Sequence, residues 1–241
     1  MPRQSIDAYD LPERVARYDA DMAVMHPNRQ KMVQIALEVL PFEPDSPLKA
    51  LDLGSGSGYF MGRFLEAYPQ SKVYGLDGAQ AMIDLARARL RGKEGEVTLR
   101  VGDFRDVSRI FAGEDFDVVF SSYALHHLTF EEKVSVVRDA VSLLRPGGWF
   151  LNADVIIAET PSLERRIQAL RVQGIVERAG GQDPRFINHQ TARRYLEEME
   201  TEEGDQPLTL AQDVQALRDA GLRDVAIFWL EYREAVTGGR K

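Results

Sequence analysis

The sequence contains no cysteine among its 241 residues, and this absence removes several classes of function. Without thiols the chain has no disulfide, no thiolate nucleophile, no cysteine zinc site and no cysteine-bound iron–sulfur cluster of the kind used in radical chemistry. The sequence also lacks a run of about 18 apolar residues that could cross a membrane. Its first residues, MPRQSIDAYD, lack the apolar centre of a secretory signal. We therefore expect a soluble, cytoplasmic protein with no membrane partner.

Acidic residues outnumber basic residues in this chain. The 30 lysines and arginines stand against 38 aspartates and glutamates, which gives a net charge of -8 at pH 7. An excess of negative charge repels a phosphate backbone. Nucleic acid is therefore a disfavoured partner, and we expect a small-molecule substrate. The oligomeric state is left open, with a homodimer as one alternative.

Helices and strands are expected to alternate over most of the chain. Helical spacing marks segments 11–22 and 28–40, before Pro41, Pro44 and Pro47 interrupt the pattern. The strands that follow are expected at 48–53, 72–77, 96–101, 116–122 and 149–157, with helices at 59–68, 79–90 and 130–144. Thr129 and Glu132 have capping-box spacing at the start of the last helix. Strands and helices that alternate in this way form a parallel sheet covered on both faces.

The alternation breaks after residue 157. A helix is expected from Pro161 to the Gly180–Gly181 pair, and a polar helical stretch continues to about Pro207. A capped helix over 209–221 and two strands over 223–238 complete the chain. The sequence therefore predicts one α/β domain with an N-terminal helical cap (1–47), a core (48–157), a helical lid insertion (158–207), and a C-terminal helix with strands (208–241).

Residues 51–60, LDLGSGSGYF, place glycines at positions 54, 56 and 58 directly after the first core strand. Glycine permits a close ligand approach that a Cβ would prevent, and ligands of open α/β sheets bind beyond the carboxyl ends of strands. The dinucleotide pattern G-x-G-x-x-G is not met, because residue 59 is tyrosine. Asp52, two residues before the turn, is a poor neighbour for a pyrophosphate and a good one for an ammonium group. The turn therefore indicates a cationic ligand.

Two further carboxylates end the next two strands. Asp77 stands 25 residues after Asp52, close to the interval at which a carboxylate accepts hydrogen bonds from ribose hydroxyls. The third strand ends in Gly102, Asp103 and Phe104, where a carboxylate can accept from the adenine amine and a ring can flank the base. None of these strand ends presents the lysine of a phosphate site. A ligand with an adenosine, a cationic amino-acid end and no phosphate is S-adenosylmethionine.

In these features the sequence resembles the class I, Rossmann-like S-adenosylmethionine-dependent methyltransferases. The resemblance rests on five segments in order: ALDLGSGSGYF, VYGLDGAQAM, VGDF, FDVVFSSYALHHL and LLRPGGWFLNAD. It implies a seven-stranded, mostly parallel sheet whose last strand is antiparallel, with S-adenosylmethionine as the cofactor. The residues implied around the cofactor are Tyr18, Asp52, Gly54, Ser55, Gly56, Gly58, Asp77, Gly78, Met82, Gly102, Asp103, Phe104, Ser121, Ser122 and Tyr123. Tyr18 is the member of this set that belongs to the cap.

Three residues are candidates for catalysis, in the order His127, His126 and Asp154. Each is a candidate general base, which is needed only where the nucleophile must lose a proton, as an alcohol or phenol does. The alternative for Asp154 is a turn-capping role, and for one of the histidines a packed or hydrogen-bonded one. No metal site is expected, because adjacent side chains point in different directions and no carboxylate stands at ligand spacing.

The segment after the fourth strand, SSYALHH, excludes some acceptors within the family. It lacks the Asn-Pro-Pro-aromatic or Asp-Pro-Pro-aromatic signature for base amines, the Pro-Cys nucleophile, and the acid of the metal-dependent catechol type. What remains is O- or N-methylation of a small molecule by in-line displacement, under a cover formed by the cap and the lid insertion. The alternatives are an NAD oxidoreductase, a non-catalytic S-adenosylmethionine-binding protein, and an enzyme resembling the carboxy-S-adenosylmethionine synthases. An arginine that faces the sulfonium, such as Arg193 or Arg194, would distinguish the last.

Overall fold

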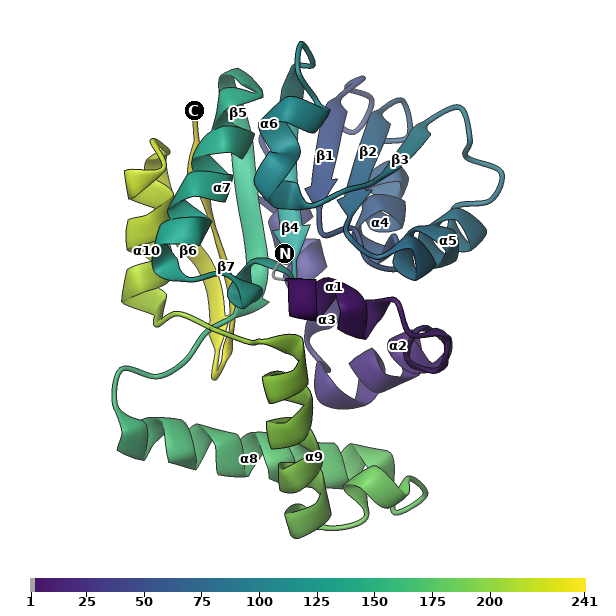
Figure 1. Ribbon diagram of the computed structural model, residues 1–241. Coiled ribbons are helices and arrows are strands. Elements are labelled where there is room, and N and C mark those ends of the chain that lie inside the picture. Colours follow the sequence, from purple (N-terminus) through teal and green to yellow (C-terminus); the bar gives the residue numbers. More distant parts are fainter. Residues whose placement is uncertain (1–2) are drawn as a thin grey trace.

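The computed structural model describes residues 3–241, so the first two residues of the expected cap lie outside the described residues. Seven strands form one sheet in the order β3-β2-β1-β4-β5-β7-β6 (Figure 1). They are β1 (Lys49–Leu53), β2 (Lys72–Asp77), β3 (Val97–Val101), β4 (Phe116–Ser122), β5 (Leu144–Val155), β6 (Arg223–Glu231) and β7 (Glu234–Arg240). β7 runs antiparallel to both of its neighbours, and β1 to β5 pair in parallel. The Rossmann-like, mostly parallel sheet expected from the sequence is confirmed.

The expected helices are present, and the structure adds a short helix between β3 and β4. The helices are α1 (Arg3–Tyr9), α2 (Pro12–Met25), α3 (Arg29–Glu38), α4 (Tyr59–Ala67), α5 (Gln80–Arg89), α6 (Val107–Ile110), α7 (Phe130–Ser142), α8 (Pro161–Ala179), α9 (His189–Glu203) and α10 (Leu210–Asp219), with the short 3-10 turns η1 (Phe104–Asp106), η2 (Leu125–His127) and η3 (Pro184–Phe186). The capping box of Thr129 and Glu132 forms at α7 as predicted. Helix α1 lies in the N-terminal helical cap that the sequence predicts, whereas α6 was not predicted, because its four residues are too few to show a helical period.

Apolar side chains bury both faces of the sheet. On one face Phe111 and Phe116 belong to a cluster that includes Val137 of α7 and Leu217 of α10. On the other face Phe60 and Phe64 of α4 pack with Met32 of α3 and Phe120 of β4. The layers therefore combine helices that lie between strands in the sequence with α3, which precedes the first strand. No helix within residues 3–241 is long and apolar enough to span a membrane.

Parallel register brings several strand ends to one edge of the sheet. Leu53 of β1 is paired with Leu76 of β2 and with Ser121 of β4. Ser122 of β4 is in turn paired with Ala153 of β5. The residues that follow these positions therefore meet at the same edge, which in Figure 1 is the lower edge, above α1, α2 and α3.

Helices α8 and α9 lie beyond that edge (Figure 1), where α9 contacts α1 and α8 contacts α2, while α3 packs on a face of the sheet. They have an apolar cluster of their own, in which Ile175 of α8 and Leu196 of α9 pack with Phe186 of η3. Met25, at the end of α2, joins the same cluster. We refer to α8, η3 and α9 as the lid. The lid and the N-terminal helices therefore pack together at the edge where the strands end.

A buried ion pair ties α7 and α10 to the sheet. Lys133 donates to Asp213 over 2.5 Å, and their side chains are 1% and 2% exposed. Asp213 also accepts from the Thr237 hydroxyl of β7 over 2.9 Å. Removing one member of such a pair leaves a buried charge without a partner.

We expect Lys133→Met to lower the free energy of unfolding by about 3–5 kcal/mol, because it strands the Asp213 carboxylate. Urea denaturation followed by circular dichroism measures the change. The control is Arg193→Ala, which breaks a pair whose side chains are 70% and 61% exposed, and which we expect to cost at most about 0.5 kcal/mol. Equal effects of the two substitutions would contradict the role given to the buried pair.

Candidate functional site

The glycine turn after β1 adopts backbone conformations, and makes close contacts, that residues with a side chain would not tolerate. Gly54, Gly56 and Gly58 have φ values of 70°, 50° and 73°, in the left-handed region. A Cβ on Gly54 would lie 2.4 Å from the Cβ of Ala124. The amides of Gly54 and Ser55 both donate to the Leu76 carbonyl, over 2.8 and 3.1 Å. The turn is therefore held against β2 and leaves no room for side chains at its first glycine.

Asp77 fastens this turn to the start of α5. One of its carboxylate oxygens accepts from the Gly56 amide over 2.8 Å, and the other accepts from the Ala79 amide over 2.9 Å. Burial raises the pKa of Asp77, and these amide hydrogen bonds offset part of the effect. The carboxylate thus fixes the glycine turn and the backbone of Ala79, the residue that precedes α5, and it does not itself cap that helix.

Asp52 is a buried carboxylate without a partner. It is 1% exposed, and neither of its oxygens has a hydrogen bond among residues 3–241. Burial, and then the charge of Asp77, hold its pKa well above the usual range for a carboxyl group. A buried carboxylate without a partner is costly, and a cationic group placed beside it would remove that cost. The residues present therefore fit the ammonium group of S-adenosylmethionine at this position.

The N-terminal helices cover the same edge. The Tyr18 hydroxyl of α2 would lie 3.5 Å from a Cβ on Gly56, and the Ile6 side chain of α1 would lie 2.5 Å from one on Gly78. Asp10 accepts from the Ala81 amide at the start of α5 over 2.8 Å. The cap is therefore packed directly on the residues expected to bind the cofactor, and Tyr18 lies at the turn as the sequence analysis expected of a cap residue.

The residues expected on the adenosine side contact other residues of the protein or are buried. Asp103 accepts from the Arg105 backbone amide over 2.9 Å and pairs with the Arg105 guanidinium over 2.7 Å. Phe104 and Met82 are 1% and 2% exposed. A Cβ on Gly102 would lie 2.7 Å from the Ile110 side chain. Their roles toward adenine therefore stay predictions.

The segment after β4 divides into structural and cavity-facing residues. The Ser121 hydroxyl donates to the Leu53 carbonyl over 2.7 Å, and Ser122 is partly exposed at the strand end. Tyr123 has a φ of 50°, which is uncommon for a residue with a side chain and carries strain. Its hydroxyl donates to Glu234 of β7 over 2.7 Å, which holds the side chain in place.

His26, between α2 and α3, forms a dyad with the same glutamate. Its Nδ1 lies 3.1 Å from a Glu234 carboxylate oxygen, and the other oxygen accepts from the Asn28 amide over 2.9 Å. Burial lowers the pKa of His26, although Glu234 opposes the effect. The imidazole is therefore neutral near pH 7, and Nε2 is the ring nitrogen left to accept a proton. The sequence analysis missed this residue, because a lone histidine at a helix end gives no signal.

The three predicted catalytic residues also meet at the sheet edge. His126 Nδ1 lies 2.6 Å from an Asp154 oxygen, and His127 Nδ1 lies 2.9 Å from an Asp205 oxygen. Burial alone would lower the pKa of His126, but the carboxylates of Asp154 and Asp205 outweigh it and raise the pKa to about 10. His127 is fully buried, and burial, followed by the charge of His126, lowers its pKa. His126 therefore holds its proton at neutral pH, and His127 has no exposed surface.

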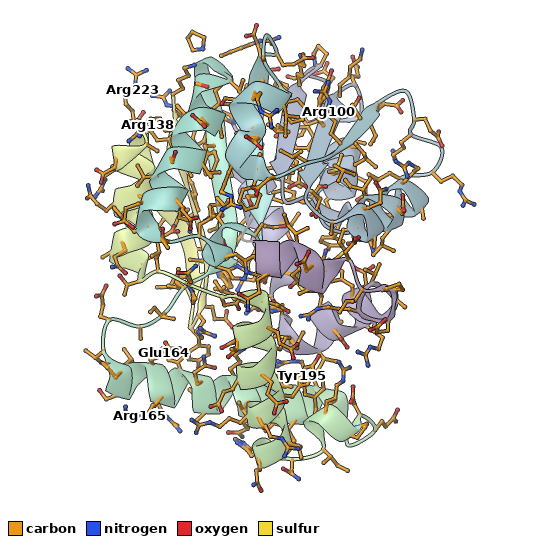
Figure 2. All side chains as sticks on the ribbon, viewed as in Figure 1. Arg100, Arg138, Glu164, Arg165, Tyr195 and Arg223 are labelled. Atoms are coloured by element: carbon orange, nitrogen blue, oxygen red, sulfur yellow. The ribbon has the colours of Figure 1, made fainter. Side chains whose placement is uncertain are left out.

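A cavity lies between this edge, the cap and the lid. Its lining includes Tyr18, His26, Tyr123, His126, Met199 and Asp205. Arg14 pairs with Glu203 at its wall, and Arg171 pairs with Glu200. Figure 2 shows Glu164 on the side of α8 that faces the sheet and Arg165 on the opposite side. Glu164 lies 3.1 Å from Arg233 in the β6–β7 turn. The cavity is thus lined by paired charges and apolar side chains from all three parts.

Curated proteins share the core of this chain. Residues 50–148 match the family described as Methyltransferase domain. An uncharacterized methyltransferase of Anoxybacillus flavithermus is 33% identical over 129 residues, which cover 54% of this chain and 57% of that protein. Another, of Oceanobacillus iheyensis, is 28% identical over 178 residues, which cover 72% of this chain and 78% of that protein. The chain therefore spans little more than half the length of the first of these relatives.

A solved structure extends the likeness to the whole fold. An O-methyltransferase family protein from Burkholderia thailandensis superposes with a TM-score of 0.67 at 21% identity, over 97% of this chain and 61% of that chain. The family match spans the glycine turn, Asp77 and Asp103, on a sheet with a single antiparallel strand. The core of this chain is therefore a methyltransferase domain with the class I, Rossmann-like fold, and S-adenosylmethionine is the cofactor of that domain.

Proposed function

We propose that the protein transfers the methyl group of S-adenosylmethionine to a small molecule held in the cavity under the lid. The observation that carries the proposal is the buried Asp52 carboxylate, which lacks a partner beside the glycine turn and is suited to an ammonium group. When bound, S-adenosylmethionine supplies a methyl group on a positively charged sulfur, which is a good leaving group. The protein's contribution is then to align the acceptor and to exclude water.

The residues proposed to hold the cofactor are those of the sequence analysis. Asp52 would pair with the ammonium group, the turn from Gly54 to Gly58 would pass under the methionine part, and Asp77 would accept from the ribose hydroxyls. Tyr123, at the end of β4, would lie near the sulfonium. Tyr18 would close the site from above, since its hydroxyl already lies beside Gly56.

We infer that His26 Nε2 accepts the proton when the acceptor is a hydroxyl. The His26 and Tyr123 rings are 4.6 Å apart, so the imidazole lies beside the residue proposed to be near the sulfonium. The Glu234 carboxylate would keep Nδ1 of His26 protonated before the reaction, and it would stabilise the imidazolium that forms when Nε2 accepts a proton. The sequence analysis ranked the candidate general bases in the order His127, His126 and Asp154, and that ranking stays a prediction. The high pKa of His126 and the burial of His127 favour His26 as the base instead.

The synthase-like alternative requires an unpaired arginine facing the cofactor. Arg193 and Arg194 are exposed on α9, and Arg193 pairs with Glu197 on the same helix. Arg171 and Arg233 do line the cavity, but both contact Glu200. The arrangement therefore favours transfer of the methyl group over recognition of a carboxylate by a free arginine.

We expect S-adenosylmethionine and S-adenosylhomocysteine to bind in calorimetry, and NAD not to bind. Because burial raises the pKa of Asp52 in the free protein, an ammonium group that stabilises the carboxylate releases a proton at pH values below that raised pKa. Affinity then increases with pH until Asp52 is ionised in the free protein. Titrations in buffers with different ionisation heats measure the released proton. Asp52→Asn should remove the release and weaken binding about tenfold or more. Binding of NAD alone would refute the proposal.

Asp77→Ala should weaken the affinity for S-adenosylhomocysteine by about 10- to 100-fold, because hydrogen bonds to charged groups contribute roughly 1.5–3 kcal/mol. Asp84→Ala is the control, since Asp84 lies on α5 with its side chain 57% exposed. Circular dichroism and a thermal melt separate lost binding from lost folding. An unchanged affinity of folded Asp77→Ala would remove the ribose assignment.

His26→Gln should lower kcat on a hydroxyl acceptor by about 10²- to 10⁴-fold and remove the low-pH limb of the rate profile. An acceptor is found first, by screening alcohols, phenols and amines for transfer of a labelled methyl group. Glu234→Gln should show a smaller loss, and His189→Gln, at the exposed start of α9, should show none. A His26→Gln enzyme that keeps wild-type kcat and pH profile would exclude His26 as the base.

A further inference from the structure

His126, His127 and Asp205 form a buried cluster that the proposed reaction does not use. The histidines lie in η2, and Asp205 follows α9, 78 residues further along the chain than His127. One ligand atom of each residue lies within 4.8 Å of the other two. The sequence analysis expected no metal site because no carboxylate stands near the histidines in sequence. The fold supplies that carboxylate from the lid.

The separations suit a tetrahedral ion. Asp205 Oδ1 lies 2.9 Å from His127 Nδ1 and 3.6 Å from His126 Nε2. Two ligand atoms that are each about 2.0–2.1 Å from a tetrahedral ion stand about 3.3–3.4 Å apart. These two distances lie on either side of this value, and the histidine ligand atoms lie within 4.8 Å of each other, so side-chain rotations would bring the three atoms into coordination.

His127 and Asp205 have buried polar atoms without hydrogen-bond partners, and these atoms point to a ligand. His127 is 0% exposed, and neither of its ring nitrogens has a hydrogen bond among the described residues. Asp205 Oδ1 also has none, although His127 Nδ1 is 2.9 Å away, because the two groups are not aligned for a hydrogen bond. Buried polar atoms without partners are rare in proteins and call for an explanation. A cation that both atoms could coordinate would supply one.

Asp154 provides the outer contact that metal-binding histidines usually have. It lies 2.6 Å from His126 Nδ1, which leaves Nε2 turned toward Asp205. With neutral imidazoles, Asp154 and Asp205 leave the cluster with two negative charges, which one divalent ion balances. The carboxylates that favour a protonated His126 attract a divalent ion more strongly, because the interaction scales with the charge.

The backbone holds the three residues in place. The Gln206 amide donates to the His126 carbonyl over 2.8 Å, and the Gln206 side chain donates to the His127 carbonyl over 3.3 Å. Asp205 is therefore positioned next to the histidines by its neighbour in the chain. His126 and Asp205 also line the cavity, which gives an ion a path to the cluster.

We propose that His126 Nε2, His127 Nδ1 and the Asp205 carboxylate bind a divalent transition-metal ion such as Zn²⁺, with Asp154 orienting His126. Two nitrogen donors and one oxygen donor favour Zn²⁺, Co²⁺ or Ni²⁺ over Mg²⁺ and Ca²⁺, which prefer oxygen ligands. The ion would join the end of the lid to the sheet beside the cavity. The inference does not depend on the proposed methyl transfer, since metal binding is measured without an acceptor.

The test titrates full-length protein, dialysed against a chelator, with Zn²⁺ and with Co²⁺. We expect one ion per chain by calorimetry and elemental analysis, and visible Co²⁺ absorption of a low-coordinate site. Asp205→Asn and His127→Gln should remove stoichiometric binding, and Asp154→Asn should weaken it by about 10- to 100-fold. His189→Gln, at an exposed histidine, is the matched control and should bind as the wild type does.

An unchanged circular dichroism spectrum and thermal melt show that each variant is folded, and Asp205→Asn is the safer variant because its side chain is 14% exposed. Absence of saturable Zn²⁺ and Co²⁺ binding in the wild type would overturn the proposal. So would equal binding by the wild type and folded Asp205→Asn. Loss of S-adenosylmethionine binding by the wild type would count against the proposed function and leave the metal result unaffected.

Discussion

The parallel pairing of β1 with both β2 and β4 is the constraint on which the site depends. It sets Leu53 opposite Leu76 and Ser121, so the glycine turn, Asp77 and Tyr123 emerge at one edge. A shift of one residue in either pairing would turn these side chains to the other face of the sheet. The chemistry at the edge is therefore positioned by backbone hydrogen bonds in the sheet interior, and the turns only complete it.

Charge pairs at the cavity wall join parts of the chain that are distant in sequence. Arg14 of α2 pairs with Glu203 of α9, and Arg185 of η3 pairs with Asp21 of α2 over 2.6 Å. Such pairs gain little net free energy once desolvation is counted, but a member left alone in the interior is costly. The cap and the lid are thus matched to each other, and water around the cavity is replaced by fixed charges.

The sequence was informative where a pattern is local. The alternation of strands and helices, the capping box of Thr129 and the acids at the ends of β1, β2 and β3 are each contained in short windows, and the fold and its edge followed from them. His26, Glu234 and Asp205 could not be found in that way, because each is a single polar residue whose neighbours are set by how the cap and lid dock. For the same reason the sequence could not show that a carboxylate lies beside His126 and His127. Helix α6 was missed because it has only four residues.

The separate apolar cluster of the lid has a consequence for how this protein can change. Ile175, Phe186 and Leu196 pack among themselves and with Met25, and none of them belongs to either cluster that covers the sheet. The family match ends at residue 148, before the lid begins. Substitutions in the lid can therefore reshape the wall of the cavity without disturbing the layers that hold the cofactor edge. A lineage with this architecture can exchange one substrate for another while it inherits its cofactor chemistry intact.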